Sequence, residues 1–188
     1  MIANQVAGLL ASPFTAPLSD FDSIQTVTVG SGGASYAEFT SISGTYKHLQ
    51  IRAIARDTDG ATGQGAFWIQ CNSDTGSNYS WHRVYGDGST ATAGAASSTT
   101  AILAGINSRS GNASSIFGST IVDLLDYSNT NKYKTVRGLS GNDTNSLGYV
   151  GLHSGLWMNT AAITSIKIFS SSPANWAQYS SFALYGVK

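Results

Sequence analysis

The sequence predicts an all-β fold, an antiparallel β-sandwich of the jelly-roll type with a short N-terminal arm. Segments rich in β-branched and aromatic residues recur along most of the chain. Turn-forming pairs such as Asp59-Gly60 and Asp87-Gly88 separate many of them. After residue 22, no segment has the apolar spacing of a helix longer than two turns. Short strands separated in this way are typical of two-sheet sandwiches and jelly rolls.

The predicted arm comprises residues 1–22. It contains Pro13 and Pro17, and its apolar residues recur at helix-like spacing before Pro13. A helix this short is not stable alone, so we expect the arm to order against another surface. Its apolar residues are the candidate contacts to a partner protein: Ile2, Val6, Leu9, Leu10 and Phe14.

Residues 23–188 are predicted to form a single β-sandwich domain. Strands are expected at 24–29, 35–42, 46–56, 66–71, 79–85, 115–127, 132–139, 148–157, 162–169 and 181–187. The segment 46–56 alternates most clearly, because apolar Leu49 and Ile51 point one way and Arg52 and Arg56 the other. Such a strand belongs to an antiparallel sheet whose other side is solvated or forms an interface.

Two other segments lead to specific expectations. The segment 181–187 is apolar on both faces and is expected to be a central strand or one that closes the core. The segment 86–115 has low complexity. We expect it to be a long surface excursion with at most one strand, near residues 101–106.

The stretch 126–145 holds a cluster of basic residues. In an extended strand Lys132 and Lys134 point to one face and Arg137 to the other, so they cannot form one phosphate-binding patch. Asp123 and Asp126 on the preceding strand are expected to offset these charges across a hairpin. Three apolar residues are expected to anchor the hairpin to the core: Tyr127, Tyr133 and Leu139.

The composition disfavours several classes of function. The formal net charge is zero and only 11% of residues are charged, which argues against binding to nucleic acid. Abundant Ser, Thr, Asn and Gly suit contact with protein or with sugars. Cys71 is the only cysteine, so no intrachain disulfide can form. No basic leader and no membrane-spanning segment are evident, so we expect the chain to fold in a cytoplasm.

No catalytic or metal-binding motif is found in the sequence. His48, His82 and His153 have no second ligand at a short spacing, and Cys71 has no activating neighbour. We therefore expect no enzymatic activity, no catalytic residues, no metal site and no cofactor.

Two stretches place oxygen ligands at alternate positions, as calcium loops do. They are 56–60 and 72–76, in which Asp57, Asp59 and Asp74 are the candidate ligands. A calcium loop of the EF-hand type also needs a distal glutamate, and the acids of this chain are few. Turn formation is therefore the favoured interpretation, and ion binding is the alternative.

The chain contains 4 tryptophans and 9 tyrosines. A sandwich core and an oligomer interface together contain about this many aromatic residues. Placement in the core and in such an interface is therefore the favoured interpretation. The alternative is a sugar-stacking surface. Its candidate glycan contacts are Trp81, His82 and Tyr85, which follow an Asn-Tyr turn.

Several blocks of the sequence resemble one family. The blocks are "TYKHLQIRAIAR", "NSDTGSNYSWHRVYGDG", "DYSNTNKYKTVRGLSG", "SGLWMNTAAITSI" and "YSSFALYGVK". In this order they are similar to a recurrent β-rich domain of tailed-bacteriophage virion, minor tail, tail-fibre and head-decoration proteins. The resemblance covers roughly residues 36–188 and leaves the arm outside. It implies display on a virus particle, commonly as a trimer, and it supplies no catalytic residues.

The first functional prediction is a capsid decoration or cement protein that binds the assembled head and stabilises it. It would be a homo-oligomer, expected to be a trimer, in contact with the major capsid protein or tail components. It would be assembled in the host cytoplasm and located in the virion. The alternative is a tail-fibre or tail-tip protein that recognises a host glycan through loops 86–115 and 142–147. A carbohydrate-binding module of a bacterial enzyme is disfavoured, because no signal peptide or linker is evident.

Overall fold

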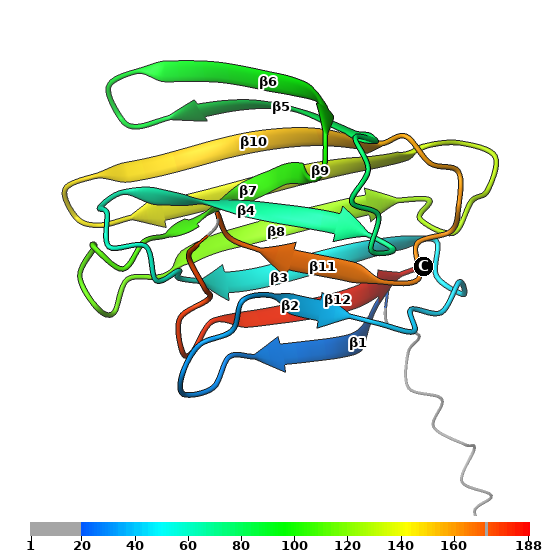
Figure 1. The fold of residues 1–188 in the computed structure, drawn as a ribbon, viewed down its shortest axis with the longest axis horizontal. Coiled ribbons are helices and arrows are strands. Elements are labelled where there is room, and N and C mark those ends of the chain that lie inside the picture. Colours follow the sequence, from blue (N-terminus) through cyan, green and yellow to red (C-terminus); the bar gives the residue numbers. More distant parts are fainter. Residues whose placement is uncertain (1–19, 172) are drawn as a thin grey trace, which may run out of the picture.

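The computed structural model describes residues 20–171 and 173–188. They form two antiparallel β-sheets packed as a sandwich, which confirms the predicted fold class (Figure 1). The arm contacts predicted at Ile2, Val6, Leu9, Leu10 and Phe14 lie outside the described residues. Within the described part of the chain, no helix is long and apolar enough to span a membrane.

The larger sheet has eight strands. Their order across the sheet is β1 (Phe21–Thr28), β12 (Ser181–Val187), β3 (His48–Ala55), β8 (Gly118–Leu125), β9 (Lys134–Asp143), β10 (Gly148–Trp157), β5 (Tyr79–Gly86) and β6 (Ala91–Thr99). The smaller sheet has the order β2 (Ala37–Phe39), β11 (Ile166–Phe169), β4 (Gln64–Cys71) and β7 (Ile102–Ser108). Figure 1 shows the larger sheet extending from β1 at the lower edge to β6 at the upper edge.

The core lies between the two sheets and follows from period-two alternation. On β3, Leu49 and Ile51 are fully buried, whereas Arg52 and Ile54 face outward. From the smaller sheet, Phe67 and Ile168 close on them from the opposite side. Each such side chain contributes about 1.5–3 kcal/mol through burial, so the inner faces supply most of the stability. The alternation predicted for 46–56 is confirmed over His48–Ala55 and fails at Arg56.

Strand β7 lies unusually close to the larger sheet. A Cβ atom added to Gly138 on β9 would lie 1.9 Å from the carbonyl oxygen of Ala104. One added to Gly155 on β10 would lie 2.2 Å from Cγ2 of Ile102. Glycine at these two positions therefore allows the two sheets to approach, and every residue of β7 is buried.

The strand predicted near residues 101–106 is confirmed by β7. The expectation that the rest of 86–115 is a long surface excursion is wrong, because this segment also contains strand β6. Strand β6 is built from Ala, Thr, Gly and Ser and lies at the edge of the sheet, where it pairs only with β5. Because an edge strand made of small residues shows no apolar alternation, its sequence resembles a loop.

Arg56 was expected on the solvated face and is instead buried, with 6% of its surface exposed. Strand β3 ends one residue earlier, and the guanidinium turns toward the loop that precedes β8. It donates hydrogen bonds of 2.5–3.0 Å to four carbonyl oxygens, those of Ser110, Asn112, Ala113 and Ile116. Arg56 therefore satisfies backbone acceptors that this loop cannot pair in a sheet.

The basic residues of the hairpin are split over two faces of β9, as predicted. Arg137 lies on the outer face and Lys134 on the inner face, as the strand geometry predicts. Lys134 is buried, and its Nζ donates to the carbonyl oxygens of Asn129, Lys132 and Thr160 at 2.6–3.0 Å.

The three expected anchors of this hairpin behave differently from one another. Tyr127 is buried, and its hydroxyl donates to the carbonyl oxygen of Ser43. Tyr133 and Leu139 are 52% and 51% exposed, so the expectation that they anchor the hairpin to the core is wrong. Leu139 lies on the face of β9 that points away from the smaller sheet, and Tyr133 lies in the turn that precedes β9.

The C-terminal strand β12 lies between β1 and β3. Phe182 and Leu184 are fully buried, while Ala183 and Tyr185 are partly exposed on the outer face. The expectation of an interior strand for residues 181–187 is therefore confirmed.

Candidate functional site

A row of aliphatic side chains crosses the outer face of the larger sheet. Ile121 on β8 pairs in register with Leu139 on β9, Leu139 with Leu152 on β10, and Leu152 with Val84 on β5. Their side chains are between 40% and 55% exposed. Directly opposed residues on one face of a sheet lie in contact, so these four form one continuous apolar row.

A second, interrupted row lies beside the first, one pleat away along the strands. It contains Ile54 on β3 and Val150 on β10, which are 52% and 60% exposed. Ser119 and Gly141 stand between them in register and leave a hollow of about 490 Å³. We call the six aliphatic residues of the two rows the aliphatic patch: Ile54, Val84, Ile121, Leu139, Val150 and Leu152.

A polar row borders the patch on its other side. Asp123 accepts hydrogen bonds from Arg137 Nη2 at 2.7 Å and from Gln50 Nε2 at 2.8 Å. The same row continues in register through Ser154 to His82 on β5. The patch is thus rimmed by side chains that remain hydrated or pair with a neighbouring charge.

Arg52 closes the β3 end of the apolar row. Its guanidinium lies 5.0 Å from the ring centroid of Phe21 and 4.9 Å from that of Tyr185. Cation–π contacts on two sides hold its charge at the margin of the sheet face. The apolar row therefore has a charged end at β3 and small alanines at β6, where Ala93 pairs with Val84.

The chemistry of this face is that of a protein-binding surface. Six aliphatic side chains, each roughly half exposed, are contiguous and rimmed by polar residues. Soluble monomers rarely carry large patches of this kind, and covering one with another apolar surface gains about 25 cal/mol per Å².

The patch adjoins a more polar groove at one end of the sheet. This groove of about 800 Å³ lies between the β5–β6 turn and the β9–β10 turn. Asp87, Asn145 and Tyr149 line it together with Phe117. The carboxylates of Asp87 and Asp143 accept backbone N–H groups of their own turns, which gives both turns a fixed shape.

The structure separates the three candidate glycan contacts. Trp81 and Tyr85 point to the inner face of β5, with Arg83 between them at 5.9 Å and 4.7 Å from their ring centroids. Trp81 packs against the core and its ring meets Trp68 edge-on at 6.2 Å. His82 points to the outer face in register with Ser154. The three side chains do not form one platform, and their contact with a glycan stays a prediction.

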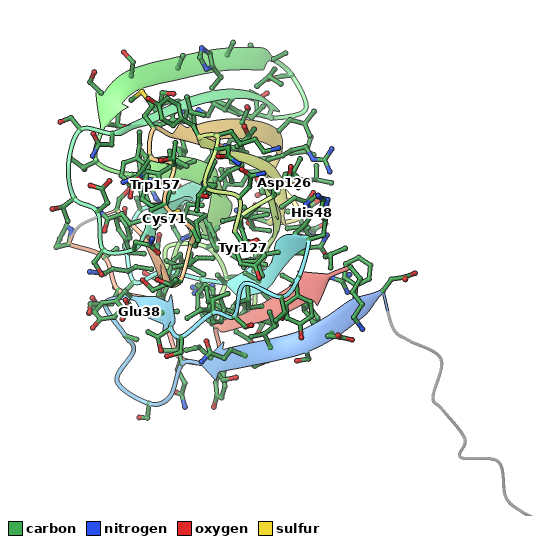
Figure 2. All side chains as sticks on the ribbon, turned by 90° about the vertical axis from the view of Figure 1, so that its right-hand side faces the viewer. Glu38, His48, Cys71, Asp126, Tyr127 and Trp157 are labelled. Atoms are coloured by element: carbon green, nitrogen blue, oxygen red, sulfur yellow. The ribbon has the colours of Figure 1, made fainter. Side chains whose placement is uncertain are left out.

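The three histidines occupy three different environments. His153 is 3% exposed, and burial followed by the charge of Arg83 lowers its pKa to about 4. His48 accepts the backbone N–H of Asp126 on Nδ1 at 2.9 Å, and Figure 2 shows these two residues side by side at one end of the sandwich. His82 is exposed on the outer face.

Cys71 and Trp157 lie within the sandwich interior (Figure 2). Burial raises the pKa of the Cys71 thiol to about 12, so the thiolate that a nucleophile requires is not available near neutral pH. The residue behaves as a small apolar side chain, as the sequence suggested.

The aspartates considered as calcium ligands have turn and core roles. Asp57 is buried and accepts Ser170 Oγ at 2.6 Å, and Asp59 pairs with Arg109 at 3.2 Å. Asp74 accepts the indole N–H of Trp157 at 2.8 Å, and this bond lowers the pKa of its carboxyl group. Across residues 20–171 and 173–188, no three His, Cys, Asp or Glu side chains group as metal ligands would.

Sequence reasoning did not identify the aliphatic patch. The available signal was apolar residues on both faces of 115–127 and 148–157, whereas strands with a solvated face alternate. Comparisons with known proteins found no matching family model, no matching curated protein and no matching solved structure.

Proposed function

We propose that this protein is a structural component of a tailed-bacteriophage virion, most specifically a capsid decoration or cement protein. In this role it acts by binding and carries out no enzymatic reaction. The observation that supports the proposal best is the aliphatic patch, a broad exposed surface suited to burial against protein. The sequence resemblance to phage structural proteins supplies the biological setting.

The mechanism is linkage between binding and assembly. A protein that binds the assembled head better than free capsid subunits stabilises the shell by mass action. The chain forms a symmetric homo-oligomer, for which the resemblance implies a trimer, and such oligomers present several equivalent contacts to a lattice. The apolar residues of the arm contact the major capsid protein. A chain in which only 11% of residues are charged suits this crowded setting.

The direct test is to delete the gene from the phage that carries it. Particles without the protein should lose infectivity faster on heating, and imaging should show heads that lack regular surface density. Supplying the wild-type chain in trans during growth should restore both properties. Unchanged heat resistance and unchanged particle images would overturn the proposal. Imaging of particles with the protein labelled separates a head location from a tail location.

A second candidate function rests on the polar groove beside the patch. Its lining combines carboxylate and amide side chains from two turns with Phe117, a combination that suits sugar hydroxyls and ring faces. In this case the protein sits on the tail and its groove holds a host surface glycan.

The glycan function is tested by substitution at Asn145. This residue is exposed and lines the groove, whereas Asn131 is exposed in the β8–β9 turn, outside the groove, and provides a matched control. Asn145→Gly should reduce adsorption of phage to host cells, and Asn131→Gly should not. Equal adsorption by both variants, together with no binding on a glycan array, would exclude this function.

A further inference from the structure

We propose that the aliphatic patch is a self-association surface on which a second copy of this chain packs face to face about a twofold axis. This inference goes beyond the virion role and does not depend on it. It concerns which molecule covers the outer face of the larger sheet. Four properties of the outer face support this pairing: the order of its side chains across the sheet, its shape, its charges and its area.

The order of residues is compatible with a twofold axis that runs parallel to the strands between β9 and β10. Such an axis brings β9 of one copy over β10 of the other, and β8 over β5. Leu139 then meets the second copy's Leu152, and Ile121 meets the second copy's Val84. Every residue of the apolar row therefore finds an aliphatic partner, because the row is nearly symmetric about its centre.

The shape of the face fits the same arrangement. Val150 is the most exposed residue of the patch, at 60%, and it pairs in register with Gly141. The twofold axis places Val150 of each copy over Gly141 of the other. Because Gly141 and Ser119 leave the hollow of about 490 Å³, the protruding valine has a socket to enter. Filling that hollow would restore the close packing typical of protein interiors.

The charges select this axis over the other twofold option. With the axis along the strands, Asp123 lies over the second copy's His82, and Arg137 lies over Ser154. With the axis along the apolar row, the two copies of Arg52 would face each other across the contact. Opposed like charges in an interface cost several kcal/mol, so the axis parallel to the strands is favoured.

The area is sufficient for a stable dimer. With the axis between β9 and β10, six strands of each copy overlap, from β3 to β6, and β12 and β1 lie outside the contact. Six strands spaced about 4.8 Å apart, each rising about 3.3 Å per residue over 8 residues, form a face of roughly 650 Å². Standard specific interfaces bury about 600–1,000 Å² on each partner. Face-to-face packing of two sheets is also a common way to bury such surfaces within single domains.

The experiment uses the purified full-length chain and measures its mass by sedimentation over a concentration series. The wild type should form a dimer, or an oligomer that contains this dimer contact. Val150→Asp should raise the dissociation constant of the contact at least about tenfold, because a carboxylate would enter the apolar socket. Leu147→Asp is the matched control, since Leu147 is 47% exposed on the same hairpin but outside the patch. Circular dichroism verifies that each variant is folded.

An exchange of residues tests the twofold geometry itself. Asp123→His places two imidazoles opposite each other, and His82→Asp places two carboxylates opposite each other, so each should weaken association. The double variant restores the Asp–His pairing across the contact and should regain most of the wild-type affinity. Within one chain β8 and β5 are separated by β9 and β10, so the two residues cannot rescue each other intramolecularly.

Three outcomes would overturn the inference. A wild-type chain that stays monomeric at high concentration excludes the self-contact. An oligomer that forms equally well with Val150→Asp uses another surface. Loss of association on deletion of residues 1–19, with no effect of Val150→Asp, would identify the arm as the associating segment.

Discussion

Both faces of the larger sheet carry aliphatic side chains, but these have opposite surroundings. On the inner face, Val122 and Leu124 are fully buried beneath the smaller sheet. On the outer face of the same strand, Ile121 is 40% exposed, and Leu139 on the next strand is 51% exposed. The aliphatic residues of the two faces therefore differ in what covers them.

This difference separates what folding requires from what association requires. One apolar face is enough to fold an antiparallel sheet against a partner layer, and the other face is ordinarily polar. A second aliphatic face adds nothing to the folding of a single chain and lowers its solubility. We propose that it packs against a surface outside the chain, and the predictions below test the difference between the two faces from the largest expected effect to the smallest.

Leu124→Ala tests the inner face. The side chain is fully buried between the sheets, so its truncation removes apolar burial and leaves a cavity. The free energy of unfolding should fall by about 2–5 kcal/mol, measured by urea denaturation. A loss below about 1 kcal/mol would mean that the inner face is not the core.

His153 gives the inner face a pH dependence. Its pKa is about 4 in the folded protein and about 6.5 in the unfolded chain, because burial disfavours the charged imidazole. Folding therefore favours the neutral imidazole. The stability that this preference contributes is fully present above pH 6.5 and is lost as the pH falls toward 4. The free energy of unfolding should fall by on the order of 3 kcal/mol over this range.

The measurement is the urea midpoint at several pH values between 7 and 4.5. His153→Gln should flatten the dependence in this range relative to the wild type. Identical pH profiles for the wild type and His153→Gln would contradict the role assigned to burial of this imidazole.

The sequence was sufficient to predict the fold class and most strands. Alternation at 46–55 identified the inward face of β3, and turn residues identified the hairpins. Strand β6 could not be found in this way, because an edge strand of Ala, Ser, Thr and Gly has no apolar period. The burial of Arg56 and of Lys134 was not predicted, since their carbonyl partners come from loops whose position only the tertiary fold determines.

The outer face shows a further limit of sequence reasoning. Leu139 was assigned to the core because it is apolar, and period-two alternation alone does not say which of two apolar faces is covered. That choice depends on where the smaller sheet lies, which is a long-range property of the chain. The aliphatic patch is visible only after registers place Ile121, Leu139 and Leu152 next to one another.

Arg137→Ala tests the polar border of the outer face. Arg137 pairs with Asp123 at 2.7 Å, but its side chain is 69% exposed. Exposed ion pairs contribute about 0.2–1 kcal/mol, so the free energy of unfolding should change by no more than this amount. The small effect should shrink further in concentrated salt. A loss comparable to that of Leu124→Ala would show that the border is part of the folding core.

Leu139→Ala tests the outer face itself and should have the smallest effect on the isolated chain. At low protein concentration the free energy of unfolding should stay within about 0.5 kcal/mol of the wild type, because the lost side chain is half exposed. At high concentration the wild type should gain stability from self-association and the variant should gain less. A comparison of Leu124→Ala with Leu139→Ala at both concentrations therefore separates the two faces, since only the outer face contributes a stability that depends on concentration.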